Sequence, residues 1–502
     1  MDSLKDSFGV RLVAFGELSV VTVAAFVPSG IPVRICDEQL ADAETHPPEN
    51  VIFLTGKSNQ APRSRELALH YRSLGKTVLI GGPYATLAGE YFEGACDALV
   101  KGEIEEIHTQ IFEDLARGSL QSIYQGTRAD LSLSPAPRWD LYPNQLATSG
   151  TLQTSRGCPF TCEFCDVIQY AGQKQRHKSP DQILVELDEL YRAGYRQVFL
   201  SDDNFTAHRS HARRILEAIA EWNSEPSRDR VLFFTQLSID ATLDKDLFEL
   251  TAQAGLHRAF VGIETINQES LKETTKVQNL RGDILTNTEY LLRQGIAVYA
   301  GMIVGFDHDD LGTFHEQANF LAASPVAAFS MGALIAYRST PLYQRMLEEG
   351  RIDLERGDAQ FQLWESNMKF KNMSDEEFRH GYFWFISEVF SARQFSKRLM
   401  RGVQLFGRDR PEIFNYNWPK VSSDPGQRWF EQVLRDISAL GEEEAELVST
   451  FVRETHGNIL KQRVFGKYLY CYHQVRFMFR ELFESSSEDS LRLHELTQLR
   501  GQ

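Results

Sequence analysis

Cysteine and long apolar runs are scarce in this sequence. Its 502 residues include six cysteines, too few for a secreted domain held together by disulfides. The longest apolar run, near residues 18–27, is too short to cross a bilayer, so we expect no transmembrane segment. Residues 1–6 lack the basic stretch that opens a secretory signal. These absences predict a cytoplasmic protein, with peripheral membrane association left open.

Positive charge is also scarce relative to negative charge. The chain has 53 Lys and Arg against 69 Asp and Glu, a formal net charge of −16. Proteins that follow nucleic-acid phosphates gather Lys and Arg, so we predict no nucleic-acid partner. Hydrophobic residues make up 42% and charged residues 24% of the chain. These fractions are typical of a globular protein, and the length predicts about two to four domains.

Half of the cysteines lie in one short segment, as Cys158, Cys162 and Cys165. A [4Fe–4S] cluster normally takes four protein ligands, so three thiolates on one loop leave one iron open to a small chelating molecule. The alternative is a zinc knuckle, but a closed zinc site needs four ligands and no suitably spaced cysteine or histidine follows. The segment therefore predicts a cluster that performs chemistry. We expect the other three to be small buried apolar residues: Cys36, Cys96 and Cys471.

The spacing of these cysteines, with Phe164 directly before the last one, resembles the radical S-adenosylmethionine (radical SAM) superfamily. In that family the amino and carboxylate groups of S-adenosylmethionine chelate the open iron. One electron from the cluster then releases a 5′-deoxyadenosyl radical. By this resemblance the three cysteines are the cluster ligands, and Phe164 packs near the adenine.

Short apolar runs alternate with amphipathic stretches over the first predicted domain, residues 1–125. Residues 33–36, 51–54 and 77–80 have the composition of buried parallel strands, and residues 63–74 that of a helix ended by Gly75. This alternation predicts a flavodoxin-like or Rossmann-like α/β sheet. Such sheets bind ligands beyond the carboxyl ends of their strands.

Glycines follow the strand at 77–80 and the next apolar run, residues 97–101. This pattern resembles the cobalamin-binding domain that precedes many radical SAM cores. The resemblance implies cobalamin contacts at the strand ends: Ser58, Gly81, Gly82, Pro83, Gly102 and Glu103. The first strand, near residues 10–15, is poorly formed, and no DxHxxG run supplies a histidine below the cobalt. A domain that only packs against the core is therefore the alternative.

Six further strand-like segments, separated by helices, follow a proline-bearing linker at residues 126–150. They lie at 152–155, 197–200, 232–237, 259–263, 298–304 and 327–335. One intervening helix is well marked, because Ser179 suits its N-cap, Pro180 its first turn and Gly194 its end. The series predicts a partial (β/α)6 barrel over residues 151–340, with its site at the carboxyl ends of the strands.

Polar residues and one glycine follow the successive barrel strands. By resemblance they contact S-adenosylmethionine, with the aspartates near its amino group and the glycine near its adenine: Asp202, Asp203, Gln236, Ser238, Glu264 and Gly305. The alternative for any single acidic residue is an N-cap of the next helix. Arg338, in the turn after the last strand, is either an anion clamp or a solvent-facing residue.

Residues 341–502 are predicted to form a helical C-terminal domain. Its aromatic residues recur at helical spacing, which is normally the mark of a core: Phe378, Tyr382, Phe385, Tyr468, Tyr472 and Phe479. The alternative is a wall around an apolar substrate. The acidic run 442–444 is expected to be a solvated helix face.

The resemblance narrows, over about residues 17–351, to cobalamin-dependent radical SAM proteins with a helical C-terminal domain, including hopanoid C-2 methylases. It implies methylation of an unactivated carbon in a small-molecule or lipid-like substrate, with flavodoxin or ferredoxin as an electron donor. Three alternatives stay open. The first is a radical SAM oxidoreductase, cyclase or rearrangement enzyme without methyl transfer. The second is an RNA methylthiotransferase, although this sequence lacks the additional upstream cluster cysteines expected of that class. The third is an iron–sulfur redox or sensor protein.

Overall fold

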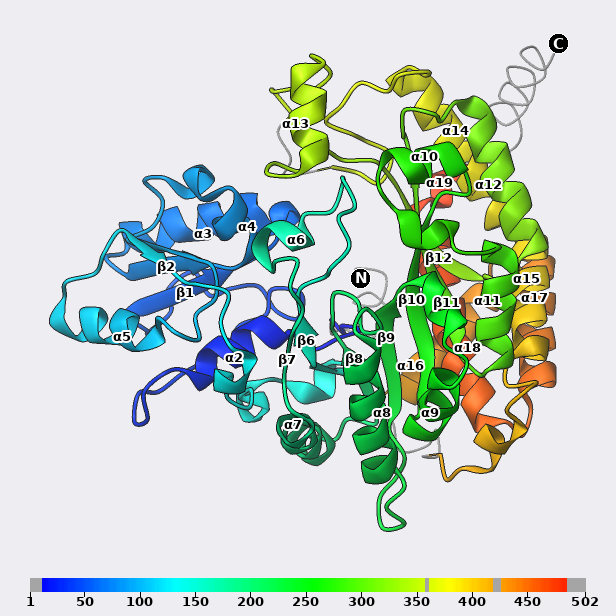
Figure 1. Cartoon of the computed structure of the whole chain (residues 1–502), viewed down its shortest axis with the longest axis horizontal. Helices are drawn as coiled ribbons and strands as arrows, with labels where there is room; N and C mark the ends of the chain where they lie inside the picture. The colour runs from blue at the N-terminus through cyan, green and yellow to red at the C-terminus, as the bar shows by residue number, and fades with distance from the viewer. Residues whose placement is uncertain (1–10, 357–360, 419–425, 485–502) are drawn as a thin grey trace.

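The computed structural model describes residues 11–356, 361–418 and 426–484. The outer ends of the first and last predicted domains therefore lie outside the described residues. An N-terminal α/β unit lies on one side of a larger parallel sheet, and the C-terminal helices lie on the other (Figure 1). No helix of the described residues is both long and apolar enough to span a membrane.

The N-terminal unit is built on a four-stranded parallel sheet with the strand order β1-β2-β3-β4. Its elements are α2 (Leu18–Ala25), β1 (Val51–Thr55), η1 (Ser58–Gln60), α3 (Ala61–Ser73), β2 (Thr77–Gly81), α4 (Pro83–Leu87), η2 (Gly89–Phe92), β3 (Ala98–Lys101), α5 (His108–Arg117) and β4 (Ile123–Gln125). Val78 and Ile80 pack with α3 and α4, whereas Leu79 packs with α5. Both faces of the sheet are thus covered, as a parallel sheet requires.

The strands predicted at 51–54 and 77–80 are confirmed, as is the helix that ends before Gly75. The strand predicted at 33–36 is wrong, because that segment is irregular and largely open to solvent. Arg34 pairs there with Glu44 and Glu49 in place of a strand ladder. Cys36 is exposed, so its expected burial is also wrong.

Three short 3₁₀ turns form the connection between the two sheets: η3 (Leu131–Leu133), η4 (Trp139–Leu141) and η5 (Asn144–Leu146). Trp139 and Tyr142 of this connection are buried against the barrel core. In place of the poorly marked first strand, the described residues from 11 onward form an isolated bridge between Val13 and Ala147.

The central sheet has six parallel strands in the order β12-β11-β10-β9-β8-β5. These strands and the elements between them are β5 (Gly150–Leu152), β6 (Ser155–Arg156), α6 (Val167–Tyr170), β7 (Arg176–His177), α7 (Pro180–Arg192), β8 (Gln197–Leu200), α8 (Arg209–Asn223), β9 (Leu232–Leu237), η6 (Ile239–Leu243), α9 (Leu247–Ala254), β10 (Leu256–Glu264), α10 (Gln268–Glu273), η7 (Val277–Leu280), α11 (Ile284–Arg293), β11 (Ala297–Val304), α12 (Leu311–Ala323) and β12 (Ala328–Ala333). The sequential order of six parallel strands is that of a partial barrel.

Five of the six predicted barrel strands lie where the sequence places them, within a few residues. The first is displaced, since β5 ends at Leu152 and the predicted run continues into β6. The cause is a contact with a distant residue: the backbone N–H groups of Thr154 and Ser155 donate to the Asp202 carboxylate rather than to a neighbouring strand. The predicted N-cap Ser179 and first-turn Pro180 of α7 are confirmed.

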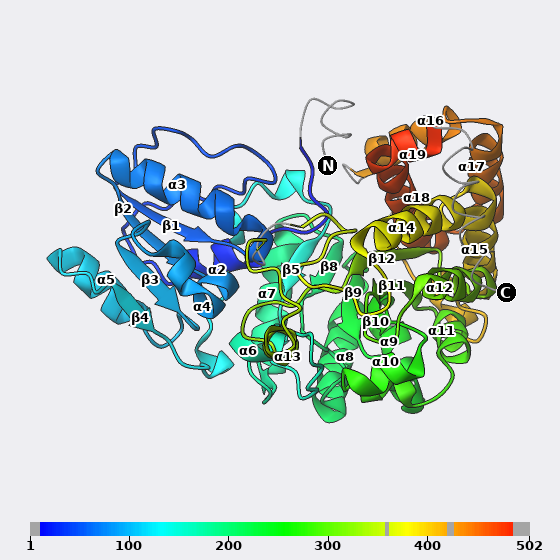
Figure 2. The same cartoon turned by 90° about the horizontal axis from the view of Figure 1, so that it is seen from above.

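Beyond the central sheet the described regular elements are helices, and the irregular segment between the first two of them contains an isolated bridge between Ile352 and Met368. The elements are α13 (Pro341–Glu348), α14 (Asp375–Val389), α15 (Ala392–Leu405), η8 (Pro411–Asn415), α16 (Gly426–Ser438), α17 (Glu442–Thr455), α18 (Ile459–Met478) and α19 (Arg480–Glu484). Figure 2 shows α6 and α13 at the junction between the N-terminal unit and the central sheet.

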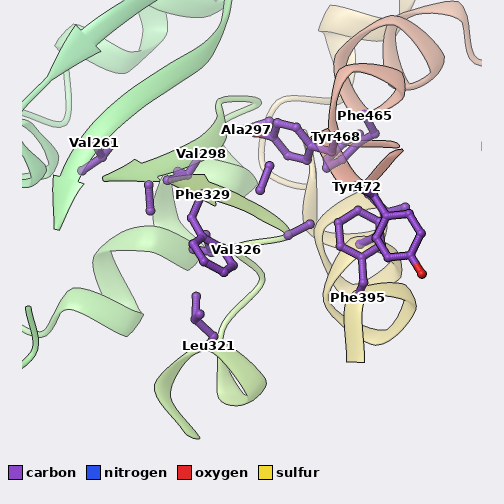
Figure 3. Packing of buried hydrophobic residues seen from close by; sticks show 14 of the residues in the cluster. Val261, Ala297, Val298, Leu321, Val326, Phe329, Phe395, Phe465, Tyr468 and Tyr472 are labelled. Carbon is purple, nitrogen blue, oxygen red and sulfur yellow. The ribbon is translucent and has the colours of Figure 1, made fainter. Parts of the chain in front are cut away.

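The C-terminal helices share one apolar core with the central sheet. Val298 and Phe329 of the sheet lie in the same cluster as Phe395, Phe465 and Tyr472 of α15 and α18 (Figure 3). The aromatic stripes are therefore core residues, as their spacing predicts. Burial of this apolar surface fixes the helices to the sheet.

The acidic run at the start of α17 is only partly solvated. Glu444 is 6% exposed and accepts from Arg476 at 2.9 Å and from Tyr472 at 3.2 Å. The expectation of a wholly solvated face is therefore wrong for this residue, because an arginine on α18 faces it.

Candidate cysteine-loop and cofactor site

The three clustered cysteines lie on one loop beyond the carboxyl end of β5. This cysteine loop, residues 157–175, is closed by β6 and β7, which pair in antiparallel fashion. Gly157 opens the loop at φ +100°, and a Cβ there would lie 2.8 Å from the Lys174 carbonyl oxygen and 2.9 Å from that of Gly172. Only glycine suits this position, because the backbone conformation and the close approach both exclude a side chain.

The cysteine side chains differ in exposure. Cys162 is 6% exposed, and Cys158 and Cys165 are half-buried. The Gln278 side-chain amide donates to Cys162 Sγ at 3.5 Å. Burial raises the pKa of the Cys158 thiol and raises that of Cys165 to about 12. Metal coordination requires thiolates. Burial makes a thiolate costly to form, and the positive charge of bound iron would offset that cost.

The donor set fits a cluster better than a single metal ion. Among the residues that the structure describes, no three His, Cys, Asp or Glu side chains converge on a position for one metal ion. In a cubane each cysteine binds a different iron, so its thiolates need not converge on one point. Three thiols on one loop therefore suit a [4Fe–4S] cluster with one iron left open.

Asp202 and Asp203, which are predicted to contact a cofactor, also hold the entry to the cysteine loop. Asp202 has no exposed surface and accepts from Thr154 N at 2.7 Å, Ser155 N at 3.0 Å and Ser155 Oγ at 2.9 Å. Asp203 accepts from Gly157 N at 2.7 Å, and burial raises its pKa to about 6. Neither aspartate caps α8.

We expect Asp202→Ala to lower the free energy of unfolding by about 3 kcal/mol. The change leaves the buried N–H groups of Thr154 and Ser155 without acceptors, at roughly 1–3 kcal/mol each. Urea denaturation followed by circular dichroism measures the effect. The control is Asp140→Ala, which breaks an exposed pair with Arg138. Equal stability of the two variants would contradict this account of Asp202.

The fourth and fifth barrel strands end in unusual backbone. Glu264 has φ +61°, is 8% exposed and pairs with Lys276 Nζ at 2.6 Å. Lys276 Nζ also lies 5.9 Å from the centre of the Phe164 ring. Gly305 has φ +114°, and a Cβ there would lie 2.4 Å from the Phe370 ring. The glycine is therefore required by packing against Phe370.

Ser238 and Gln236, at the end of β9, differ in their hydrogen bonding. The Asn204 side-chain amide donates to Ser238 Oγ and joins the ends of β8 and β9. Gln236 is half-buried, and within the described part of the chain its side chain has no hydrogen bond. Gln236 is thus the member of the predicted set whose polar atoms are open to a ligand.

One arginine, Arg345, pairs with three carboxylates beside the cysteine loop, and no sequence pattern predicted this group. We call Arg345 and its partners the hub. Arg345 of α13 pairs with Glu163 at 2.7 Å, Glu273 at 2.8 Å and Asp307 at 2.7 Å. Arg351 also pairs with Asp307, at 2.7 Å. Although burial opposes it, the two arginines lower the pKa of Asp307. The acidic residues are visible in sequence, but their distant arginine partner carries no local signal.

The predicted cobalamin residues lie at the carboxyl edge of the N-terminal sheet. Gly82 has φ +95° and a Cβ there would lie 2.4 Å from Thr55 Oγ1, while at Gly102, φ +80°, it would lie 2.4 Å from the Gly126 carbonyl oxygen. Gly81 ends β2, Pro83 begins α4 and Ser58 begins η1. Since α4 packs beside α6 of the cysteine loop, this edge faces the cysteines.

Glu103 and Arg338 form ion pairs with other parts of the protein. The Glu103 carboxylate pairs with Arg156 at 3.0 Å and with Arg176 at 2.5 Å, and both arginines lie at the base of the cysteine loop. Arg338 lies 3.7 Å from Glu90 of the N-terminal unit, so it points to another part of the protein.

Residues 152–321 match the family model of the radical SAM superfamily, and residues 340–442 match a domain of unknown function, DUF4070. The chain contains a radical SAM domain. The family predicted from the cysteine spacing is thus confirmed. The radical SAM domain covers the first five strands of the central sheet from the end of β5, and α13 with its Arg345 belongs to the DUF4070 match.

Curated relatives resemble most of the chain. An uncharacterized methyltransferase of Synechocystis sp. is 32% identical over 68% of this chain and 65% of its own length. The hopanoid C-2 methylase of Rhodopseudomonas palustris is 30% identical over 66% of this chain and 64% of its own length. The chain therefore spans just under two thirds of the length of these relatives.

A solved structure shares the fold over nearly the whole chain. The cobalamin-dependent S-adenosylmethionine radical enzyme OxsB, with aqua-cobalamin bound, superposes with a TM-score of 0.57 at 17% identity. The match covers 98% of this chain and 82% of the OxsB chain. The predicted α/β fold class, with a radical SAM barrel and helices beyond it, is confirmed.

Proposed function

We propose that this protein is a cobalamin-dependent radical SAM enzyme that methylates an unactivated carbon of a small-molecule or lipid-like substrate. One observation carries the proposal: the three-cysteine loop lies between the carboxyl edges of two parallel sheets. Ligands bind at such edges. The six-stranded sheet presents the radical SAM residues there, and the four-stranded sheet presents its glycines.

Cys158, Cys162 and Cys165 are the residues that would hold the cluster, with S-adenosylmethionine on the open iron. When bound, these cofactors supply a carbon-centred radical, and cobalamin supplies the methyl group. Lys276 lies close enough to Cys162 and Cys165 for its charge to act on both. A lysine ammonium there favours an anionic thiolate cluster.

The proposed contacts of S-adenosylmethionine are those predicted from the sequence: Phe164, Asp202, Asp203, Gln236, Ser238, Glu264 and Gly305. Features of three of them favour this role. Gln236 offers free polar atoms, and Glu264 presents a carboxylate fixed by Lys276. Phe164 packs against the apolar cluster formed by Phe306 and Leu342 with their neighbours. That cluster keeps one side of the site dry, which protects a radical from water.

Ser58, Gly81, Gly82, Pro83 and Gly102 are the proposed cobalamin contacts. Support comes from their shared position at one sheet edge and from the names of the relatives, which include a hopanoid methylase and a cobalamin-dependent radical enzyme. The hopanoid relative also favours an apolar, lipid-like substrate. Flavodoxin or ferredoxin is the proposed electron donor, since the cluster must receive one electron at a time.

Anaerobic reconstitution with iron, sulfide and hydroxocobalamin tests the function. We expect about four irons and one corrin per chain. With a strong reductant and methyl-deuterated S-adenosylmethionine, 5′-deoxyadenosine and deuterated methylcobalamin should form. Adding an apolar lipid extract should then yield products that gain one labelled methyl group, read by mass spectrometry.

The other outcomes separate the rival functions. A corrin-free protein that forms 5′-deoxyadenosine and converts a metabolite without methylating it would support an oxidoreductase, cyclase or rearrangement enzyme. A four-iron protein that forms no 5′-deoxyadenosine would support a redox or sensor protein. Either result would overturn the proposal.

A further inference from the structure

The base of the cysteine loop carries two arginines that face each other. Arg156 of β6 and Arg176 of β7 are direct partners in the two-residue antiparallel ribbon. Their side chains are only 18% and 13% exposed. Like charges directly opposite on paired strands are destabilising, and solvent screens little where burial is this extensive. The ribbon alone therefore resists closing.

Two carboxylates of the N-terminal unit pair with these arginines. Glu103 accepts from Arg176 Nη1 at 2.5 Å and from Arg176 Nη2 at 2.6 Å, a bidentate pair. It also pairs with Arg156 Nη1 at 3.0 Å, and the same nitrogen lies 3.0 Å from Glu105. The side chain of Glu103 is 10% exposed and that of Glu105 is 2% exposed. Charge within the group is balanced, two against two.

Both carboxylates are also held by the segment that connects the N-terminal unit to the central sheet. Glu103 accepts from Ala129 N at 2.9 Å, and Glu105 accepts from Ser134 Oγ at 2.9 Å. Gly102, directly before Glu103, packs tightly against Gly126. The loop after β3 thus offers Glu103 and Glu105 in fixed positions before the arginines arrive, which lowers the cost of forming the pairs.

We propose that Glu103 and Glu105 are positioning residues that close the base of the cysteine loop, so that the N-terminal unit sets the geometry of the three cysteines. The inference rests on the proposed function in that the loop is taken to hold a cluster. Glu103 was predicted to contact cobalamin, and here we propose that it joins the N-terminal unit to the base of the cysteine loop. Since Gly102, one residue away, is a proposed corrin contact, the loop after β3 would contact the corrin and also hold the base of the cysteine loop.

Hydrogen–deuterium exchange of the full-length chain tests the link. We expect Glu103→Gln to speed exchange of peptides within residues 157–175 by about tenfold, because the base opens more often. Peptides of α7 and β8 should exchange as in the wild type. Glu38→Gln is the matched control, since it breaks the Arg63 pair at 2.8 Å in the same unit and should leave residues 157–175 unchanged.

A second substitution gives a readout that general destabilisation would not produce. Arg176→Gln removes one of the two facing charges while Arg156 keeps Glu105. The double variant Glu103→Gln/Arg176→Gln should therefore recover at least half of the lost protection. After reconstitution, Glu103→Gln should retain less iron than the wild type and show a broadened electron paramagnetic resonance signal, and the double variant should recover both.

Unchanged exchange in Glu103→Gln, or additive losses in the double variant, would overturn the inference. Exchange is measured before any iron or corrin is added. The outcome is therefore distinct from a failure of the proposed function, which would show as a wild-type chain that binds neither.

Discussion

Replacing Cys162 by alanine is expected to abolish iron binding and cleavage of S-adenosylmethionine. Each of the three cysteines would hold a different iron, so the loss of one leaves two protein ligands for a cluster that normally takes four. Cys162 is the most buried of the three and receives the Gln278 amide at 3.5 Å.

The measurement is iron content after anaerobic reconstitution, together with 5′-deoxyadenosine formed under strong reductant. Both should fall to background in Cys162→Ala while circular dichroism shows an intact fold, because the change removes one sulfur atom. Cys96→Ala is the control, since this half-buried cysteine lies in the N-terminal unit. Full iron binding by Cys162→Ala, or an equal loss in Cys96→Ala, would disprove the assignment of the ligands.

Local signals were enough to predict much of the fold. Runs of buried residues predict strands β8 and β9 to the residue, and Ser179 with Pro180 predicts the start of α7. The errors arise where tertiary contacts decide. Residues 33–36 have a strand composition, but Arg34 is drawn to Glu44 and Glu49. No local pattern reveals such partners.

The site shows the same division between local and distant determinants. The cysteine spacing identifies the radical SAM loop, because its chemistry is contained in one short segment. The residues that hold the loop come from elsewhere in the chain: Asp202, Glu103 and Arg345. Their roles depend on side-chain contacts across 48, 73 and 182 positions of sequence, which composition and periodicity do not encode. From the sequence alone, an acidic residue at a strand end could therefore be either a cofactor contact or a residue that holds the loop.

Replacing Arg345 by glutamine is expected to loosen the cysteine loop and to lower the free energy of unfolding by about 2 kcal/mol. Arg345 joins Glu163, which lies between Cys162 and Cys165, to Glu273 at the end of α10 and to Asp307 in the loop after β11. Breaking a buried ion pair costs about 3–5 kcal/mol. The Arg345 side chain is 28% exposed, so water recovers part of that cost and the smaller value follows.

The distinguishing readout is loss of iron to a chelator, which should be faster in Arg345→Gln than in the wild type. Arg345→Lys should rescue it only in part, because one ammonium cannot reproduce a planar guanidinium shared among three carboxylates. Arg293→Gln is the control, since it breaks a bidentate pair with Asp409 at 2.9 Å that is remote from the cysteines. Equal iron retention in all three variants would show that the hub only stabilises the fold. Faster loss confined to the Arg345 variants would mean that α13, in the DUF4070 match, serves to hold the cysteine loop in place.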